Sequence, residues 1–289
     1  MRFNIKLVEY QSNTATIAIF DDLVGFDDDY ERGCSCDTTG VLSHDINPFT
    51  GEDASELETI ENEIEAFDRQ QKSIESSVNR SKRNVLHLMR SLDLSCSYFI
   101  TLTFDQAKVD RKDFDLCCKK GRVWLQNLRR YKNAEDMSFI CVPELHKDMV
   151  SWHLHAVICN PGEMPMADSG HKDRNGHTIY NLPGWRYGFS TAIKLDGTNP
   201  MTSIKLSKYM TKYFTKESQM ILRNRHRYFS SNNIEKPHVS KWMYESREEL
   251  EIILSQIKKK GYAFVSESSF DGYVKANYIE AIKTSSQKP

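Results

Sequence analysis

The chain has 289 residues, 39% of them hydrophobic, and a formal net charge of −1, which is the composition of a globular protein with a sizeable core. No run of eighteen apolar residues, signal-peptide pattern or even cysteine framework is visible, so we expect a cytoplasmic location in a reducing compartment and no membrane partner. Residues 1–80 carry 6 basic and 18 acidic side chains and residues 81–289 carry 33 and 22, which indicates either a basic, anion-binding body with an acidic extension or an unrelated acidic leader on an ordinary domain.

The first predicted segment is an acidic leader over residues 1–53. Two β-rich runs at 3–10 and 14–20, joined by a short polar stretch, predict a β-hairpin within it.

A long amphipathic helix is predicted over residues 54–92. Ser55 and Glu58 have the spacing of a capping box. The apolar residues recur at steps of three and four: Leu57, Ile60, Ile64, Phe67, Ile74, Val78, Val85, Leu88 and Leu92. We expect this helix to pack on its own domain, and a coiled-coil homodimer through residues 55–92 is the alternative.

Residues 93–230 alternate between strand and helix patterns. The order is a buried strand at 97–104, a helix within 110–133, strands at 138–144 and 151–160, an irregular insertion at 160–187, a strand at 189–195 and a helix at 202–217. A helix at 248–260 and a short strand at 262–268 form a C-terminal extension over residues 231–289. The predicted fold class is α+β, with helices over a mostly antiparallel sheet.

Three side chains around the predicted hairpin suit a metal ion. His153 and His155 are two apart on a strand and therefore leave the same face. Glu144 ends the preceding strand, and a hairpin brings it opposite His153. Two imidazoles and one carboxylate suit Mn²⁺, Mg²⁺ or Zn²⁺ and leave open positions on the ion, as in a catalytic site. The alternative is that the histidines are ordinary outward residues of a half-exposed strand.

The helix at 202–217 carries two tyrosines among lysines. At 100° per residue, one face carries Lys205, Tyr209, Lys212, Tyr213 and Lys216, and an adjacent apolar stripe carries Leu206, Met210 and Phe214. A tyrosine hydroxyl, with a pKa near 10, needs a cation to attack a phosphodiester, and the predicted metal would polarise the phosphate. Lys212 and Lys216 would stabilise the developing charge. Passive contact with a single-stranded nucleic acid is the alternative.

A basic run with aromatic residues follows this helix at 223–229. Arg223, Arg225 and Arg227 in this run, together with Lys205, are predicted DNA-backbone contacts, with a solvated surface as the alternative.

Three motifs in this order carry a resemblance: "FITLTF" at 99–104, "WHLHAVI" at 152–158 and "YMTKYFTK" at 209–216. They resemble the motifs of HUH endonucleases of the two-tyrosine type, which initiate rolling-circle replication in phages and plasmids. The resemblance covers about residues 80–230. It implies an HUH endonuclease domain at 93–230, with an HUH/RRM-like central antiparallel β-sheet flanked by helices.

The resemblance also implies a chemistry. Such enzymes nick one strand of single-stranded DNA at a replication origin, keep the 5′ phosphate on tyrosine, and leave a 3′ hydroxyl that primes a host DNA polymerase in a bacterial cell. The matching positions are Tyr209 and Tyr213 as nucleophiles, Lys212 and Lys216 beside them, and Glu144, His153 and His155 as ligands of Mg²⁺ or Mn²⁺. Thr101 and Thr103 match first-motif positions beside the site or the DNA.

Several alternatives stay open at this point. No P-loop pattern is present, so a host helicase is expected. The same motifs occur in HUH transposases and relaxases, and a non-catalytic RRM-like binder of single-stranded nucleic acid is an alternative of a different class. The spacing also leaves open which tyrosine attacks first.

Overall fold

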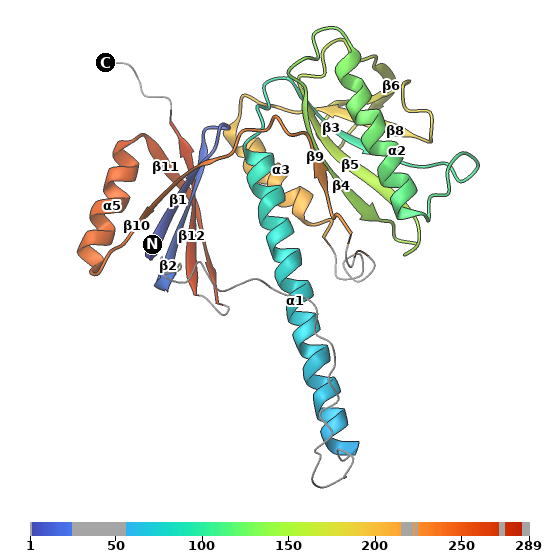
Figure 1. Ribbon diagram of the computed structural model, residues 1–289. Helices are drawn as coiled ribbons and strands as arrows, with labels where there is room; N and C mark the ends of the chain where they lie inside the picture. The colour runs from blue at the N-terminus through green and yellow to red at the C-terminus, as the bar shows by residue number, and fades with distance from the viewer. Residues whose placement is uncertain (1, 25–55, 215–221, 223–224, 272–274, 285–289) are drawn as a thin grey trace, which may run out of the picture.

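A computed structural model describes residues 2–24, 56–214, 222, 225–271 and 275–284, apart from the side chains of residues 56–66 and 68. Two antiparallel sheets lie side by side, and a long helix projects from the region between them (Figure 1). This mixture of helices and antiparallel sheets confirms the predicted α+β class. None of the helices in the described ranges combines the length and apolarity that a membrane span requires.

The larger sheet has seven strands in the order β6-β7-β8-β3-β5-β4-β9. Their bounds are β3 Ser97–Leu102, β4 Ser138–Leu145, β5 Trp152–Cys159, β6 Ala167–Lys172, β7 Thr178–Asn181, β8 Ser190–Lys194 and β9 Phe229–Ser230. The predicted strands at 97–104, 138–144, 151–160 and 189–195 are confirmed, with β3 between β5 and β8.

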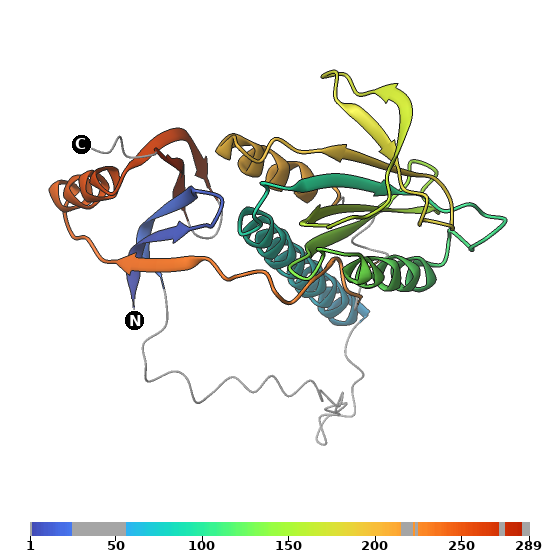
Figure 2. The ribbon, with the colours of Figure 1, turned by 90° about the horizontal axis from the view of Figure 1, so that it is seen from above.

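Helices cover both faces of this sheet. On one face, α2 (Phe114–Asn127), followed by the short 3₁₀ helix η2 (Leu128–Arg130), packs on the even-numbered side chains of β3 and β5. On the other face, α1 (Glu56–Arg90) and α3 (Pro200–Thr211) pack on Val142 and Val157. Figure 2 shows the sheet edge-on between these helices.

The predicted long helix is a single helix, and its two halves differ. Its C-terminal half is part of the core through Val78, Val85 and Met89. Its N-terminal half extends away from both sheets (Figure 1), and Phe67 is 59% exposed there. The expectation that the helix packs on its own domain is therefore confirmed for the C-terminal half.

The smaller sheet has five strands in the order β10-β1-β2-β12-β11. Their bounds are β1 Phe3–Glu9, β2 Thr14–Val24, β10 His238–Trp242, β11 Tyr262–Phe270 and β12 Ala276–Lys283, and α5 (Arg247–Lys259) covers one face through Ile257. The predicted N-terminal hairpin is confirmed. The strands of the predicted leader and of the predicted C-terminal extension share this one sheet, because β2 pairs with β12 and β1 with β10.

Two expectations about local structure are wrong. The insertion at 160–187 is not wholly irregular, because β6 and β7 form a hairpin in it that continues the sheet beyond β8. The helix predicted to 217 ends at Thr211, and the next residues form tight turns in which Tyr213 N–H donates to the Met210 carbonyl and Phe214 N–H to the Thr211 carbonyl.

Candidate active site

The hairpin of β4 and β5 brings the predicted ligands to one face of the larger sheet. Glu144 lies directly opposite His153, as predicted, and His155 lies between Val142 of β4 and Thr101 of β3. The His155 Nε2–H donates to Glu144 Oε2 at 2.5 Å, and Nδ1 lies 3.2 Å from the Thr101 hydroxyl. The imidazole is therefore held from both sides, because each ring nitrogen has a partner on a neighbouring strand.

Tyr213 lies flat on the His155 ring. The ring centroids are 4.1 Å apart and the planes differ by 3°. The side chain is only 7% exposed, and its hydroxyl has no hydrogen-bond partner within the described residues. Burial raises the pKa of this hydroxyl strongly, and the neighbouring Tyr209 and Glu144 raise it further. In this arrangement Tyr213 is a neutral, buried phenol.

Tyr209 has a different environment. It lies inside α3, is 45% exposed, and contacts the Tyr213 ring edge-on at 5.3 Å and Phe99 at 5.6 Å. It lines an open hollow of about 550 Å³ together with Lys205 and Lys212. The predicted grouping of a tyrosine with lysines therefore holds for Tyr209.

The end of α3 explains why the two tyrosines differ. Asn199 caps the helix by accepting from Met201 N–H, and Pro200 occupies the first turn. The tight turns after Thr211 place Tyr213 in the buried cluster with Met210 and Phe214. The expectation of one continuous face holding both tyrosines apart from the apolar stripe is therefore wrong for Tyr213.

The donor set suits a divalent metal ion, although no three His, Cys, Asp or Glu side chains in the described ranges are gathered around one point. Glu144 and His155 already touch, so a bound ion would replace their hydrogen bond. The His153 ring lies against His146 at 4.6 Å. Burial, His146 and His155 lower the pKa of His153, which favours the neutral imidazole that binds metals. Metal binding by these three residues stays a prediction.

The other predicted site residues are distributed around this face. The Thr103 hydroxyl donates to the Phe189 carbonyl and accepts from Phe189 N–H, so it fastens the end of β3. Arg225 pairs with Asp115 at 3.1 Å, and Arg227 donates to Ser77 of α1. Lys216 and Arg223 lie outside the described residues.

Two neighbours of the site were missed by the sequence reasoning. Phe99 stacks on His155 at 5.8 Å, and His146 lies against His153. The period-2 alternation of strands places residue 99 on the same face as Thr101, so it contained the first signal. His146 was assigned to a loop, but its N–H donates to the Ser151 carbonyl and prolongs the hairpin by one step.

Comparison with known proteins finds one similarity. Residues 97–218 match the model of a family described as replication-associated protein ORF2. The matched segment contains β3, the β4–β5 hairpin and both tyrosines. No curated protein and no solved structure matches the chain significantly.

Proposed function

We propose that this chain initiates rolling-circle replication by nicking and rejoining single-stranded DNA at an origin, with a tyrosine as nucleophile and a divalent metal ion as cofactor. The similarity to the replication-associated protein ORF2 family supports a role in DNA replication. The observation that carries the nicking chemistry is the contact chain from Glu144 through His155 to Tyr213 and the exposed Tyr209, inside the matched segment.

In the proposed reaction, the hydroxyl oxygen of Tyr209 attacks the scissile phosphorus. A bond forms between this oxygen and phosphorus while the bond from phosphorus to the 3′ oxygen breaks. The tyrosine loses its proton to solvent and the leaving 3′ oxygen takes one up, so the products are a 5′-phosphotyrosine and a 3′ hydroxyl. Lys205 and Lys212, in the same hollow, stabilise the negative charge on the phosphate oxygens. The reverse attack by a 3′ hydroxyl rejoins the strand without ATP.

The proposed ligands of the metal ion are Glu144, His153 and His155. When bound, Mg²⁺ or Mn²⁺ would act as a Lewis acid on the scissile phosphate. Thr101 holds Nδ1 of His155 and so orients Nε2 toward Glu144, a role that outer partners of ligating histidines commonly have.

Coverage of the sheet argues against the RRM-like alternative. A passive RRM-like binder stacks bases on an open sheet face. Here α2 packs on one face, α1 and α3 pack on the other, and Phe99 lies beneath Tyr209.

A covalent adduct tests the proposal directly. The full chain is incubated with Mn²⁺ and a 3′-labelled pool of randomised single-stranded oligonucleotides, because the 3′ fragment is the one that stays on tyrosine. We expect a labelled protein band on a denaturing gel, its loss in Tyr209→Phe/Tyr213→Phe, and its loss when EDTA replaces Mn²⁺. Tyr180→Phe, on β7, is the matched control. Absence of an adduct with the unaltered chain, or an undiminished adduct in the double variant, rejects the proposal.

The proposed partners follow from the same chemistry. A free 3′ hydroxyl needs a host DNA polymerase, and the displaced strand needs a host helicase. Homodimerisation through residues 55–92 is proposed for the projecting half of α1, where Phe67 is exposed. Light scattering of the full chain tests it, and a monomer at all concentrations rejects it.

A further inference from the structure

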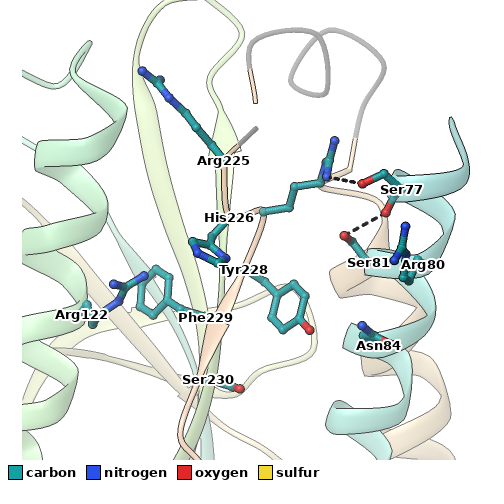
Figure 3. A pocket seen from close by; sticks show the side chains of 11 residues that line it. Ser77, Arg80, Ser81, Asn84, Arg122, Arg225, His226, Tyr228, Phe229 and Ser230 are labelled. Atoms are coloured by element: carbon teal, nitrogen blue, oxygen red, sulfur yellow. Dashed lines mark hydrogen bonds between the residues drawn. The ribbon is translucent and has the colours of Figure 1, made fainter. Parts of the chain in front are cut away.

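The edge strand β9 lies in a basic hollow that the candidate active site does not include. The hollow has a volume of about 510 Å³, and its walls come from α1, α2 and the segment at 225–230. Figure 3 shows α1 on one side of this segment and Arg122 of α2 on the other, with Tyr228 directed toward α1 and Phe229 beside Arg122.

Four arginines from three parts of the chain converge on this hollow. They are Arg80 of α1, Arg122 of α2, and Arg225 and Arg227 before β9, and no acidic residue lines the hollow. Arg225 is bound to Asp115, which lies outside it. Arg80 and Arg122 are exposed and have no carboxylate partner within the described residues. The hollow therefore presents positive charge that the described residues only partly neutralise.

The remaining lining residues suit phosphate and bases. Ser77 and Asn84 of α1 add a hydroxyl and an amide, which are common donors to phosphate oxygens. His226 and Tyr228 add rings on which bases can stack. Arginines with such donors and rings are typical of a groove that follows a nucleic-acid backbone.

The hollow continues around the edge of the sheet. A second hollow of about 300 Å³ shares Arg122, Arg225, His226 and Phe229 with the first and adds Lys119 of α2. Together they form an open groove, which we call the edge groove, from α1 to α2. An extended ligand fits such a groove better than a single small anion.

The edge groove lies close to the candidate active site. Phe229 is paired with Cys141 on β4, and Glu144 lies three residues further along the same strand, about 10 Å away. The pairing is antiparallel, so the chain before Phe229 comes from the end of β4 that carries Glu144. Arg225 lies over Phe114, whose ring contacts Trp152 beside that end.

We propose that the edge groove binds the sugar–phosphate backbone of the single DNA strand whose scissile phosphate lies at Tyr209. The inference rests on the proposed function and adds to it a second contact region, which binds the strand independently of its sequence. The groove holds the strand while cutting and rejoining take place about two or three nucleotides away.

A binding measurement without cleavage tests the groove. The full chain is titrated into a fluorescent 20-nucleotide oligothymidylate in EDTA, and the Kd is measured by anisotropy between 50 and 200 mM NaCl. We expect Arg80→Ala/Arg122→Ala to raise the Kd about fivefold or more at 50 mM. The slope of log K against log salt should fall by about 1.4, since each lost phosphate contact on a single strand removes about 0.7. Arg80→Lys/Arg122→Lys should retain most of that slope.

The matched control removes two exposed cations from α5, on the smaller sheet, in Arg247→Ala/Lys259→Ala. This pair should leave the Kd within about twofold of that of the unaltered chain. An unchanged Kd in the groove variant, an equal loss in both pairs, or a larger loss for a duplex of the same length would overturn the proposal. Because no cleavage occurs in EDTA, these outcomes are separate from the adduct assay. A chain that binds through the groove and forms no adduct would reject only the nicking chemistry.

Discussion

Tyr209 and Tyr213 are four residues apart in the chain but differ in every property that matters for attack on phosphorus. Tyr209 is 45% exposed beside Lys205 and Lys212, whereas Tyr213 is 7% exposed and lies flat on His155. Burial also raises the pKa of the Tyr213 hydroxyl. A phenol attacks more readily when it can reach the phosphate and lose its proton. We therefore infer that Tyr209 makes the first cut and that Tyr213 acts only after the turn at 212–214 rearranges.

This ranking predicts different losses for two matched variants. Tyr209→Phe should lower the single-turnover rate of adduct formation by about 100-fold or more, because the nucleophile is gone. Tyr213→Phe should lower it less than about tenfold, because the ring that packs on His155 is retained. The rates are measured with excess enzyme over a single-stranded substrate recovered from the adduct assay. The reverse ranking would contradict the inferred order.

Stability supplies an independent readout for Tyr213→Phe. Its hydroxyl is buried without a hydrogen-bond partner in the described part of the chain, and such a group carries a desolvation cost of about 1 kcal/mol or more. The variant should therefore be at least as stable as the unaltered chain in urea unfolding. A clear loss of stability would show that the hydroxyl has a partner.

Part of the candidate site could be predicted from the sequence because strand alternation is strict. Counting by two places His153 and His155 on one face, and the hairpin places Glu144 opposite His153. The environment of Tyr213 could not be predicted, because helical periodicity assumes that the helix continues. The tight turns after Thr211 depend on packing against Val142 and Val157 in the sheet.

At the scale of elements, the junction between the end of β3 and the start of β8 depends on a glycine. Asp105 N–H donates to the Tyr187 carbonyl and Thr103 N–H to the Phe189 carbonyl, so the two chains lie in close contact. A Cβ on Gly188, which lies between these partners, would come within 2.3 Å of the Thr103 carbonyl oxygen. Backbone atoms cannot rotate away as a side chain can.

Gly188→Ala should therefore lower the free energy of unfolding by about 2–3 kcal/mol, as overpacking of a close contact typically does. Thermal unfolding followed by circular dichroism measures the effect. Gly184→Ala is the matched control, because a Cβ there would make only ordinary contacts at 3.5 Å or more. Equal melting temperatures for the two variants would show that the junction adjusts without cost.

The elements differ in how visible they are in the sequence. Strands β3, β4 and β5 are apolar runs and were predicted. Strand β6, "ADSGHK", is almost wholly exposed and carries no apolar alternation, so no local pattern announces it. The pairing of β1 with β10 joins residues more than 200 positions apart, and such a partner choice depends on the tertiary fold.

At the scale of the whole molecule, a buried ion pair joins the two sheets. Arg90, at the end of α1, is 1% exposed and lies 2.6 Å from Glu280 of β12. It also donates to the Thr16 hydroxyl of β2 and lies over the Tyr10 ring. The helix that packs on the larger sheet therefore ends with its charge inside the smaller one, and the two sheets are coupled through a single arginine.

Removing one partner of this pair should destabilise the chain strongly, because the other charge stays buried without compensation. We expect Glu280→Ala to lower the free energy of unfolding by about 3 kcal/mol in urea titrations. Arg90→Met/Glu280→Met should recover most of that loss, since no charge is then left in the junction. Glu251→Ala, which breaks an exposed pair with Arg247 on α5, should cost less than about 1 kcal/mol. Equal losses for Glu280→Ala and Glu251→Ala would mean that the Arg90–Glu280 pair does not hold the two sheets together.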